Sequence, residues 1–348
     1  MTIRRAALGG VLIVAVLVVA VLVRQGRDAD PLPGPPLREL AAKRGIEIGT
    51  AVRGTEQRDN RAYRQLIAAQ FSSVTPENEL KWYALEPERG RFEYAYADMV
   101  VDRAREAGQQ VRGHALVWFN QLPRWIRELS SDELRTATEQ HIRAVMGHYT
   151  GRVGVWDVVN EAILDRGGLR RAPFLDKLGP GYIGEAFKIA RAADPKAKLF
   201  INEIGADGIN AKSDRLYEIV RDLKATGVPI DGVGLQMHSN LRGVAPTFVE
   251  NMRRFEALGL EIHITEADVG IRLPVTERKL QAQADVYKGI VDDCLAVSAC
   301  KSLTFWGFTD GRSWIPETQP GMGAATLLDE QLRPKPAFVA VQRALSAG

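Results

Sequence analysis

The sequence predicts an α/β protein of the (β/α)8 TIM barrel class, in which eight parallel strands alternate with helices around a closed ring. Eight short apolar runs alternate with longer helical patterns along the chain. Most of these runs are continuous in Val, Ile and Leu, as expected of parallel strands buried on both faces. After the first three dozen residues, the chain has the roughly 250 residues of such a barrel plus insertions. We therefore expect one barrel domain over residues 37–348.

The alternative to the barrel is a doubly wound open sheet, which usually carries a glycine-rich phosphate-binding turn after its first strand. Here the first apolar run is followed by Arg53, Gly54, Thr55 and Glu56, which do not fit that turn. The barrel is therefore the favoured fold. The expected strands are 47–52, 72–76, 110–118, 153–160, 198–202, 232–237, 261–265 and 302–306.

Several helices can be placed between and after these strands. One begins at Ser130, whose side chain can cap the helix while Glu133, three residues on, reaches back to form a capping box. Two others are expected over 276–296 and 335–345.

The N-terminus has an apolar run over residues 6–23, preceded by Arg4 and Arg5. Eighteen helical residues would span about 27 Å, just enough for a bilayer core. Residues 1–23 are therefore a signal-anchor helix or a cleaved signal peptide, and the lack of a clear small-x-small site favours the anchor. The proline-rich residues 24–36 are predicted to be a spacer. Either reading places the rest of the chain outside the cytoplasm, extracellular or anchored to the membrane.

Charge and composition exclude several classes of partner. The formal net charge is only +3 and both signs are mixed along the chain, which gives no footprint for nucleic acid. His141 and His148 share a helix without an HExxH spacing and the other histidines lie on separate strands, so no metal is expected. No cofactor is expected either. We expect a monomer that meets the membrane only through its N-terminal segment. Cys294 and Cys300 favour a disulfide in an exported chain, with two free thiols as the alternative.

Polar and aromatic residues follow six of the apolar runs. The carboxyl ends of barrel strands meet at one mouth, where catalytic groups stand. Packing alone explains such a repeated pattern poorly. The residues concerned are TPENELKW at 75–82, GHALVW at 113–118 with Asn120 and Gln121, WDVVNEA at 156–162, Gln236 and His238, TEAD at 265–268, and Trp306 and Trp314.

Two of these residues are the carboxylates that glycoside hydrolysis requires. Glu161 ends the fourth strand and Glu266 ends the seventh, so they face each other across the mouth. A retaining enzyme needs one protonated and one ionised carboxyl group about 5–5.5 Å apart. Asn160 is suited to bind a sugar 2-hydroxyl, and His238 and Asp268 could orient Glu266 and keep it ionised.

The tryptophans suggest the class of substrate. All six lie at or just beyond the predicted strand ends, where flat rings can stack on sugars. Trp82 and Trp156 could instead be core residues. The six are Trp82, Trp118, Trp125, Trp156, Trp306 and Trp314.

Together these motifs resemble glycoside hydrolase family 10, the endo-β-1,4-xylanases. TPENELKW, GHALVW, WDVVNEA, GVGLQMHS, ITEAD and LTFWGFTDGRSW occur in that family's order and spacing over residues 37–345. The resemblance implies that Glu161 is the acid/base, that Glu266 is the nucleophile, and that Cys294 and Cys300 form a disulfide. It also implies a −1 subsite of Lys81, His114, Asn160, Gln236, His238 and Trp306, and a −2 subsite of Glu77, Asn78, Gln121 and Trp314.

The chain departs from the family pattern at several positions. Phe119 replaces a histidine, Glu203 replaces an aspartate and is followed by Ile204 instead of an aromatic residue, and Ala267 replaces a leucine. Since phenylalanine neither donates nor accepts hydrogen bonds, we hypothesise that Phe119 extends the alkaline limb of the rate profile.

The rival functions are a β-1,4-glucanase or another retaining glycosidase, and a non-catalytic carbohydrate-binding barrel. The last is disfavoured because both carboxylates are present.

Overall fold

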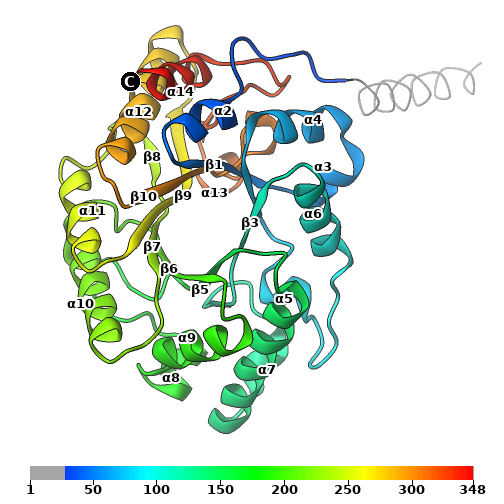
Figure 1. The fold of residues 1–348 in the computed structure, drawn as a ribbon, viewed down its shortest axis with the longest axis vertical. Helices are drawn as coiled ribbons and strands as arrows, with labels where there is room; N and C mark the ends of the chain where they lie inside the picture. The colour runs from blue at the N-terminus through cyan, green and yellow to red at the C-terminus, as the bar shows by residue number, and fades with distance from the viewer. Residues whose placement is uncertain (1–27, 348) are drawn as a thin grey trace, which may run out of the picture.

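Eight parallel strands form a closed ring in the computed structural model, which describes residues 28–347. Strand β10 pairs with both β9 and β1, which closes the ring, and helices surround it (Figure 1). The predicted barrel is confirmed. The ring contains β1 (Glu47–Val52), β2 (Ser73–Pro76), β3 (Gln110–Gly113), β5 (Val155–Asn160), β6 (Lys198–Glu203), β7 (Gly232–Leu235), β9 (Glu261–Arg272) and β10 (Cys300–Phe305), and the shorter strands are β4 (Val117–Trp118), β8 (His238–Asn240) and β11 (Met322–Gly323).

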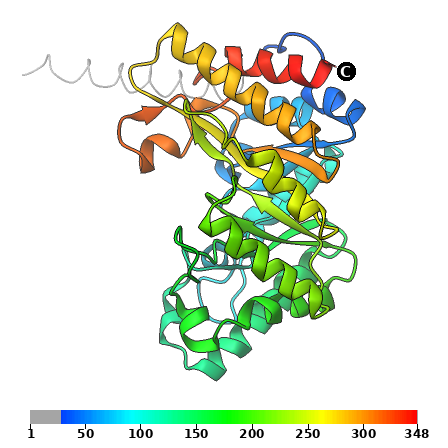
Figure 2. The same cartoon turned by 90° about the vertical axis from the view of Figure 1, so that its left-hand side faces the viewer.

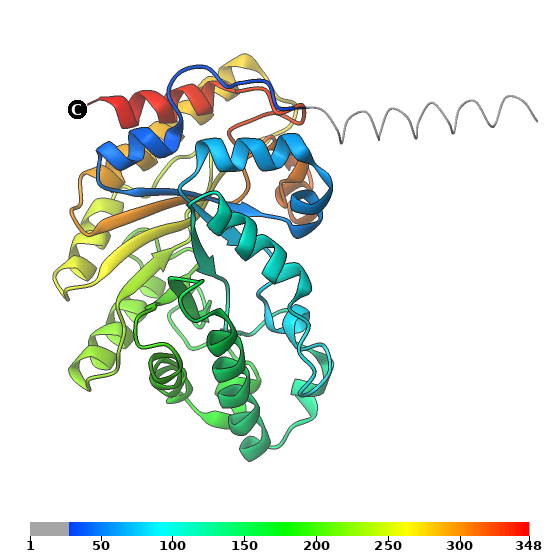
Figure 3. The ribbon, with the colours of Figure 1, turned by 45° about the vertical axis from the view of Figure 1, so that its right-hand side comes forward.

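The chain returns from each strand to the next through helices on the outside of the ring (Figures 2 and 3). These helices are α2 (Leu37–Lys43), α3 (Gly54–Asp59), α4 (Arg61–Gln70), α5 (Trp82–Leu85), α6 (Ala95–Glu106), α7 (Ser131–Tyr149), α8 (Pro173–Leu178), α9 (Tyr182–Ala193), α10 (Ala211–Ala225), α11 (Phe248–Glu256), α12 (Glu277–Leu295), α13 (Ile315–Thr318) and α14 (Pro336–Ser346), with 3-10 turns η1 (Arg124–Glu128) and η2 (Asp310–Arg312).

The capping box predicted at the start of α7 is present. The Glu133 amide donates to the Ser130 hydroxyl, and the Ser130 amide donates to the Glu133 carboxylate. Such a cap contributes about 1 kcal/mol because it satisfies otherwise unpaired amide groups.

Two predicted strands differ from the structure. The strand expected over 110–118 is divided into β3 and β4, because the His114 ring bonds Asp157 and the Leu116 amide bonds the Asp157 carbonyl between them. Strand β9 continues past residue 265 to Arg272, because β8 and β11 pair with its extension. Both differences concern the mouth, where long-range partners decide the backbone path.

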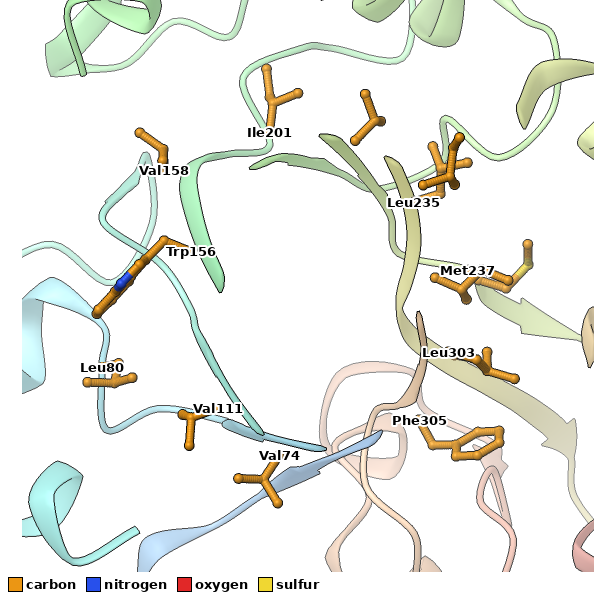
Figure 4. Packing of buried hydrophobic residues seen from close by; sticks show 14 of the residues in the cluster. Val74, Leu80, Val111, Trp156, Val158, Ile201, Leu235, Met237, Leu303 and Phe305 are labelled. Carbon is orange, nitrogen blue, oxygen red and sulfur yellow. The ribbon is translucent and has the colours of Figure 1, made fainter. Parts of the chain in front are cut away.

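Many apolar side chains of the strands point away from the interior of the ring, although Phe200 lies inside it against Arg112 and His263. Ile201, Leu235 and Leu303 lie outside the ring of strands, beneath the helices (Figure 4). The interior instead holds an ion pair between Arg112 and Asp157, both buried. The strands therefore alternate in polarity more than their sequences suggested, and polar groups continue from the interior to the mouth.

Segments at the two ends of the chain lie together. Helix α14 packs against α12 and α2 (Figure 1), and the Gln342 amide donates to the carbonyls of Pro33 and Pro35. The Cys294–Cys300 disulfide joins the end of α12 to the start of β10, as predicted. The signal or anchor segment predicted for residues 1–23 lies outside the described residues. Within residues 28–347, no helix is both long and apolar enough to cross a bilayer.

Candidate active site

The two predicted catalytic carboxylates lie at one mouth of the barrel, although Glu266 stands within β9 and not at its end, because β9 continues to Arg272. Glu161 directly follows β5 and Glu266 lies in β9, where its amide donates to the carbonyl of Gln236 just beyond β7. Glu266 is only 4% exposed, whereas Glu161 is half-buried. The two groups thus share one mouth but meet different surroundings.

Glu266 is held by side chains on both of its oxygens. Its Oε1 accepts from the Asn202 amide at 2.7 Å, and its Oε2 lies 3.2 Å from Nε2 of His238. The other ring nitrogen of His238 lies 3.0 Å from Asp268, which also accepts from Nε1 of Trp314 at 2.7 Å. These hydrogen bonds orient the imidazole of His238 toward Glu266.

The charges among these hydrogen-bonded side chains favour an ionised Glu266. Burial opposes a charge on His238, but the carboxylates of Asp268 and Glu266 raise the pKa of His238 to about 10. Burial also works to raise the pKa of Glu266, but the hydrogen bond from His238 and the positive charges nearby lower it overall. At neutral pH the site therefore contains a buried carboxylate beside an imidazolium, which is the state that a nucleophile needs.

Glu161 is held differently. Its Oε1 accepts from the amide of Gln236 at 3.2 Å and lies 3.3 Å from the amide of Asn160. Both partners are neutral. The backbone of Glu161 has φ +54°, a left-handed conformation that is uncommon for a residue with a side chain.

Asn202 links the two sides, and the sequence analysis assigned it no role. Its amide group bonds Glu266 and lies 2.9 Å from the Asn160 side chain, while its carbonyl accepts from the Glu161 amide at 2.9 Å. Its Oδ1 accepts from Thr265 at 2.7 Å, and a Cβ on Gly234 would lie 2.3 Å from that oxygen. The position of Asn202 at the end of β6 was the signal that could have identified it.

Two of the residues predicted for the −2 side, Asn78 and Gln121, bind Lys81, whereas Trp314 lies on the other side of the mouth, where it donates to Asp268. Nζ of Lys81 donates to Asn78 at 3.1 Å and to Gln121 at 2.8 Å, and it lies 4.8 Å from the Trp118 ring centroid. Burial lowers the pKa of Lys81, although the carboxylate of Glu266 opposes that shift. The remaining predicted member, Glu77, forms an ion pair with Arg53 at 2.9 Å.

His114 and Trp306 complete the predicted set. Nδ1 of His114 lies 3.0 Å from Asp157, and the His114 ring meets Trp306 edge-on at 5.3 Å. Asp157 is wholly buried and paired with Arg112, and these two residues were not predicted as supports for the site. Their charges fix the imidazole from below.

Three of the six tryptophans are packing residues. Trp156 is fully buried, and a Cβ on Gly113 would lie 2.1 Å from its ring. Trp82 stacks on His141 at 3.9 Å, and Trp125 packs edge-on against Trp82. The core positions that the sequence left open for Trp82 and Trp156 are therefore observed, whereas Trp125, expected at the mouth, packs against Trp82 instead.

Behind Glu161 lies another buried ion pair, between Glu203 and Lys212 at 3.1 Å. Burial raises the pKa of Glu203 to about 7, and Lys212 opposes that shift. Glu203 also accepts from the Ile163 amide at 3.0 Å. The glutamate at this position therefore supports the turn that follows Glu161.

An open cavity of about 410 Å³ borders the site on the side of His238. It is lined by the loops that follow β6 and β8, including Asp207, Asn210, Asn240 and Arg242. Residues 28–347 contain no group of three or more His, Cys, Asp or Glu side chains arranged to hold a metal ion.

Comparisons with known proteins agree with this geometry. Residues 36–344 match the model of a family described as Glycosyl hydrolase family 10. Endo-1,4-beta-xylanase B of Thermotoga neapolitana is 41% identical over 313 residues, which cover 88% of this chain and 90% of that protein. An endo-1,4-beta-xylanase of Agaricus bisporus is 40% identical over 306 residues, covering 87% of this chain and 92% of that protein.

Solved structures give the same result. Native xylanase 10B from Thermotoga maritima superposes with a TM-score of 0.87 and 43% identity, covering 89% of this chain and 98% of that chain. Xylanase 10B from Thermotoga petrophila in complex with xylobiose superposes with a TM-score of 0.88 and 42% identity, covering 91% and 98%.

Proposed function

The chain belongs to glycosyl hydrolase family 10, and from this membership we infer that it is an endo-1,4-β-xylanase, a hydrolase that cleaves internal β-1,4-xylosidic bonds with retention. The observation that carries this inference from the site is the unequal pair of carboxylates. Glu266 is buried and ionised beside His238, whereas Glu161 is half-buried among neutral amides.

We propose the following roles for the two carboxylates. Glu266 attacks the anomeric carbon and forms a glycosyl-enzyme, while Glu161 donates its proton to the leaving oxygen. Glu161 then takes a proton from water, which attacks the glycosyl-enzyme and releases the sugar with its original anomeric configuration. The predicted separation of about 5–5.5 Å between the two carboxyl groups remains part of this proposal.

The position of Asn202 between the two carboxylates supports these two roles. Its amide stabilises the charge on Glu266 and its carbonyl holds the backbone of Glu161. The remaining mouth residues are proposed to bind sugars. Those around the −1 subsite are Lys81, His114, Asn160, Gln236, His238 and Trp306, those around −2 are Glu77, Asn78, Gln121 and Trp314, and Trp118 binds substrate without an assigned subsite.

We propose that Gln121 and Trp314 exclude glucose. Both side chains are fixed, Gln121 by Lys81 and Trp314 by Asp268. If they close over the position of a C6 hydroxymethyl group, a glucoside must displace them, and such a clash costs a few kcal/mol by analogy with overpacking.

The test is a direct comparison of substrates. The protein should release xylo-oligosaccharides from xylan, with the β-anomer formed first by NMR, and should act weakly on carboxymethylcellulose and mannan. Aryl xylobioside should be hydrolysed roughly 100-fold faster than aryl cellobioside, as a difference of a few kcal/mol implies. Comparable rates on the two glycosides would support the β-1,4-glucanase alternative. Binding of xylan without any hydrolysis would support a non-catalytic barrel.

We also propose that the barrel works outside the cytoplasm, on the basis of the apolar run over residues 6–23. A signal-anchor predicts that the full-length protein stays in the membrane fraction after a high-salt wash. A soluble product that begins near Arg24 would instead indicate cleavage. Residence of the full-length protein in the cytoplasm, the location given for an intracellular xylanase of Thermoanaerobacterium saccharolyticum with 33% identity, would contradict export.

A further inference from the structure

Arg170 lies directly behind Glu161, in the loop that follows β5. This loop folds back on itself, with a bridge between Ile163 and Leu169. The Arg170 amide donates to the Ala162 carbonyl at 2.7 Å. The fold of the loop therefore returns Arg170 to the start of the turn that contains Glu161.

The guanidinium of Arg170 binds the main chain of that turn. Its Nε donates to the carbonyl of Glu161 at 2.9 Å, and one terminal nitrogen donates to the carbonyl of Ile163 at 3.2 Å. Its Cζ lies 4.3 Å from the centroid of the Phe119 ring, the geometry of a cation–π contact. Among residues 28–347, no carboxylate lies within ion-pair distance of this guanidinium. Its contacts in the described chain are carbonyls and an aromatic face.

Glu161 depends on these main-chain contacts. Its left-handed backbone is unfavourable for a residue with a Cβ. Its amide is tied to the Asn202 carbonyl and its carbonyl to Arg170, so both of its peptide groups are fixed. Its half-exposed carboxyl group meets only neutral amides. The direction of the carboxyl group is thus set mainly through the backbone.

We propose that Arg170 is a positioning residue for the acid/base, and that the ring of Phe119 is the surface that holds its guanidinium in place. This proposal rests on the role proposed above for Glu161. Without Arg170, the turn can relax from the left-handed conformation and the carboxyl group moves away from the leaving oxygen. Attack by Glu266 is not affected, because Glu266 is held by Asn202 and His238 on other strands.

The neighbouring Arg171 provides a matched control. It is 81% exposed and forms an ion pair with Asp176. The same change at the two positions therefore removes the same charge and side-chain volume from the same loop, but only Arg170 contacts the turn of Glu161.

The experiment compares Arg170→Met with Arg171→Met on a series of aryl β-xylobiosides. For a poor leaving group, which needs protonation, Arg170→Met should lower kcat/KM roughly tenfold or more, a part of what general acid catalysis contributes. For dinitrophenolate, which leaves without a proton, kcat/KM should stay within about twofold of the parent on the same reasoning. Arg170→Lys, which keeps one donor, should recover part of the loss, and Arg171→Met should match the parent throughout.

Two outcomes would overturn the proposal. An equal loss on all leaving groups would assign Arg170 a general structural role, and no loss on any of them would remove the role altogether. If Arg170→Met does not fold, Phe119→Leu provides a second route, with a smaller loss of about two- to fivefold confined to poor leaving groups. Failure of the parent protein to cleave any aryl xylobioside would contradict the proposed function instead, so the two failures are distinguishable.

Discussion

The nucleophile side of the mouth, around Glu266, is held by charged side chains, whereas the acid/base side, around Glu161, is held by main-chain hydrogen bonds. Glu266 is almost fully buried, and an imidazolium and an amide bind its two oxygens. Glu161 is half-buried, its carboxyl group meets neutral amides, and its two peptide groups are fixed by Asn202 and Arg170.

The difference follows from what each group must do. A nucleophile must remain charged until it attacks, so a fixed positive neighbour favours it. An acid/base must lose and regain a proton in each cycle, and a strong ionic partner would hold it in one state. Fixing the backbone of Glu161 sets its direction without committing its charge.

The largest effects should separate the two carboxylates by leaving group. Glu266→Ala should lower kcat by a factor on the order of 10⁵ or more on every substrate, because no glycosyl-enzyme can form. Glu161→Ala should lower kcat on xylan by a factor on the order of 10²–10⁴, because the leaving oxygen is no longer protonated. With an activated aryl xylobioside it should still accumulate the glycosyl-enzyme, which mass spectrometry would detect. Equal loss by both variants on the activated glycoside would remove the distinction.

His238→Asn tests the charge on the nucleophile side. The imidazolium lowers the pKa of Glu266 against the effect of burial. Its removal should therefore raise the pKa of Glu266 and move the acidic limb of kcat/KM to higher pH. At the optimum, kcat/KM should fall on the order of 10²-fold, as when one electrostatic partner of a transition state is removed. His148→Asn, a change on the outer helix α7, is the control and should leave the limb in place. An unchanged acidic limb in His238→Asn would contradict the assignment.

The same imidazolium links stability to pH. The pKa of His238 is raised to about 10 in the folded protein. The contribution of protonated His238 to the free energy of unfolding is therefore complete below its pKa in the unfolded chain, about 6.5, and is lost as the pH rises through about 10. The pKa of Glu266 is lowered, so its contribution is present above the unfolded value and is lost as the pH falls. Urea unfolding of the parent and of His238→Asn should therefore converge toward alkaline pH.

Phe119→His tests the acid/base side and should have a smaller effect. A histidine can hydrogen-bond near the acid, so we expect the alkaline limb of kcat/KM, which reports loss of the proton from the acid, to move to lower pH. The measurement is kcat/KM against pH for the parent and the variant. Superimposable alkaline limbs would mean that Phe119 acts only as a packing surface for Arg170.

The smallest expected effect on activity is that of the disulfide, which lies away from both carboxylates. Cys294 and Cys300 are separated by six positions, so Cys294→Ala/Cys300→Ala should lower the free energy of unfolding by roughly 2 kcal/mol. Denaturant unfolding measures this loss, while kcat/KM on poor and activated leaving groups should be unchanged. A change in the ratio of kcat/KM for poor leaving groups to kcat/KM for activated ones would show that the disulfide affects one of the two carboxylates.

The sequence determined the barrel, most strand positions and the two proposed catalytic carboxylates, because each of these depends on local patterns. Continuous apolar runs indicated β1, β5 and β6 close to their observed bounds. Polar residues directly after such runs indicated the mouth, since parallel strands must place these ends together.

Only the tertiary structure decided which partners hold each carboxylate. The Asn202 contact with Glu266 joins residues 64 positions apart, and the Gln236 contact with Glu161 joins residues 75 positions apart. It likewise decided between mouth and core for Trp156, at the start of β5, and Trp82, at the start of α5, and both are buried. Periodicity specifies the face and the end of a strand on which a residue lies. The hydrogen bonds that fix its charge and direction depend on how neighbouring strands are staggered around the closed ring, which no local pattern encodes.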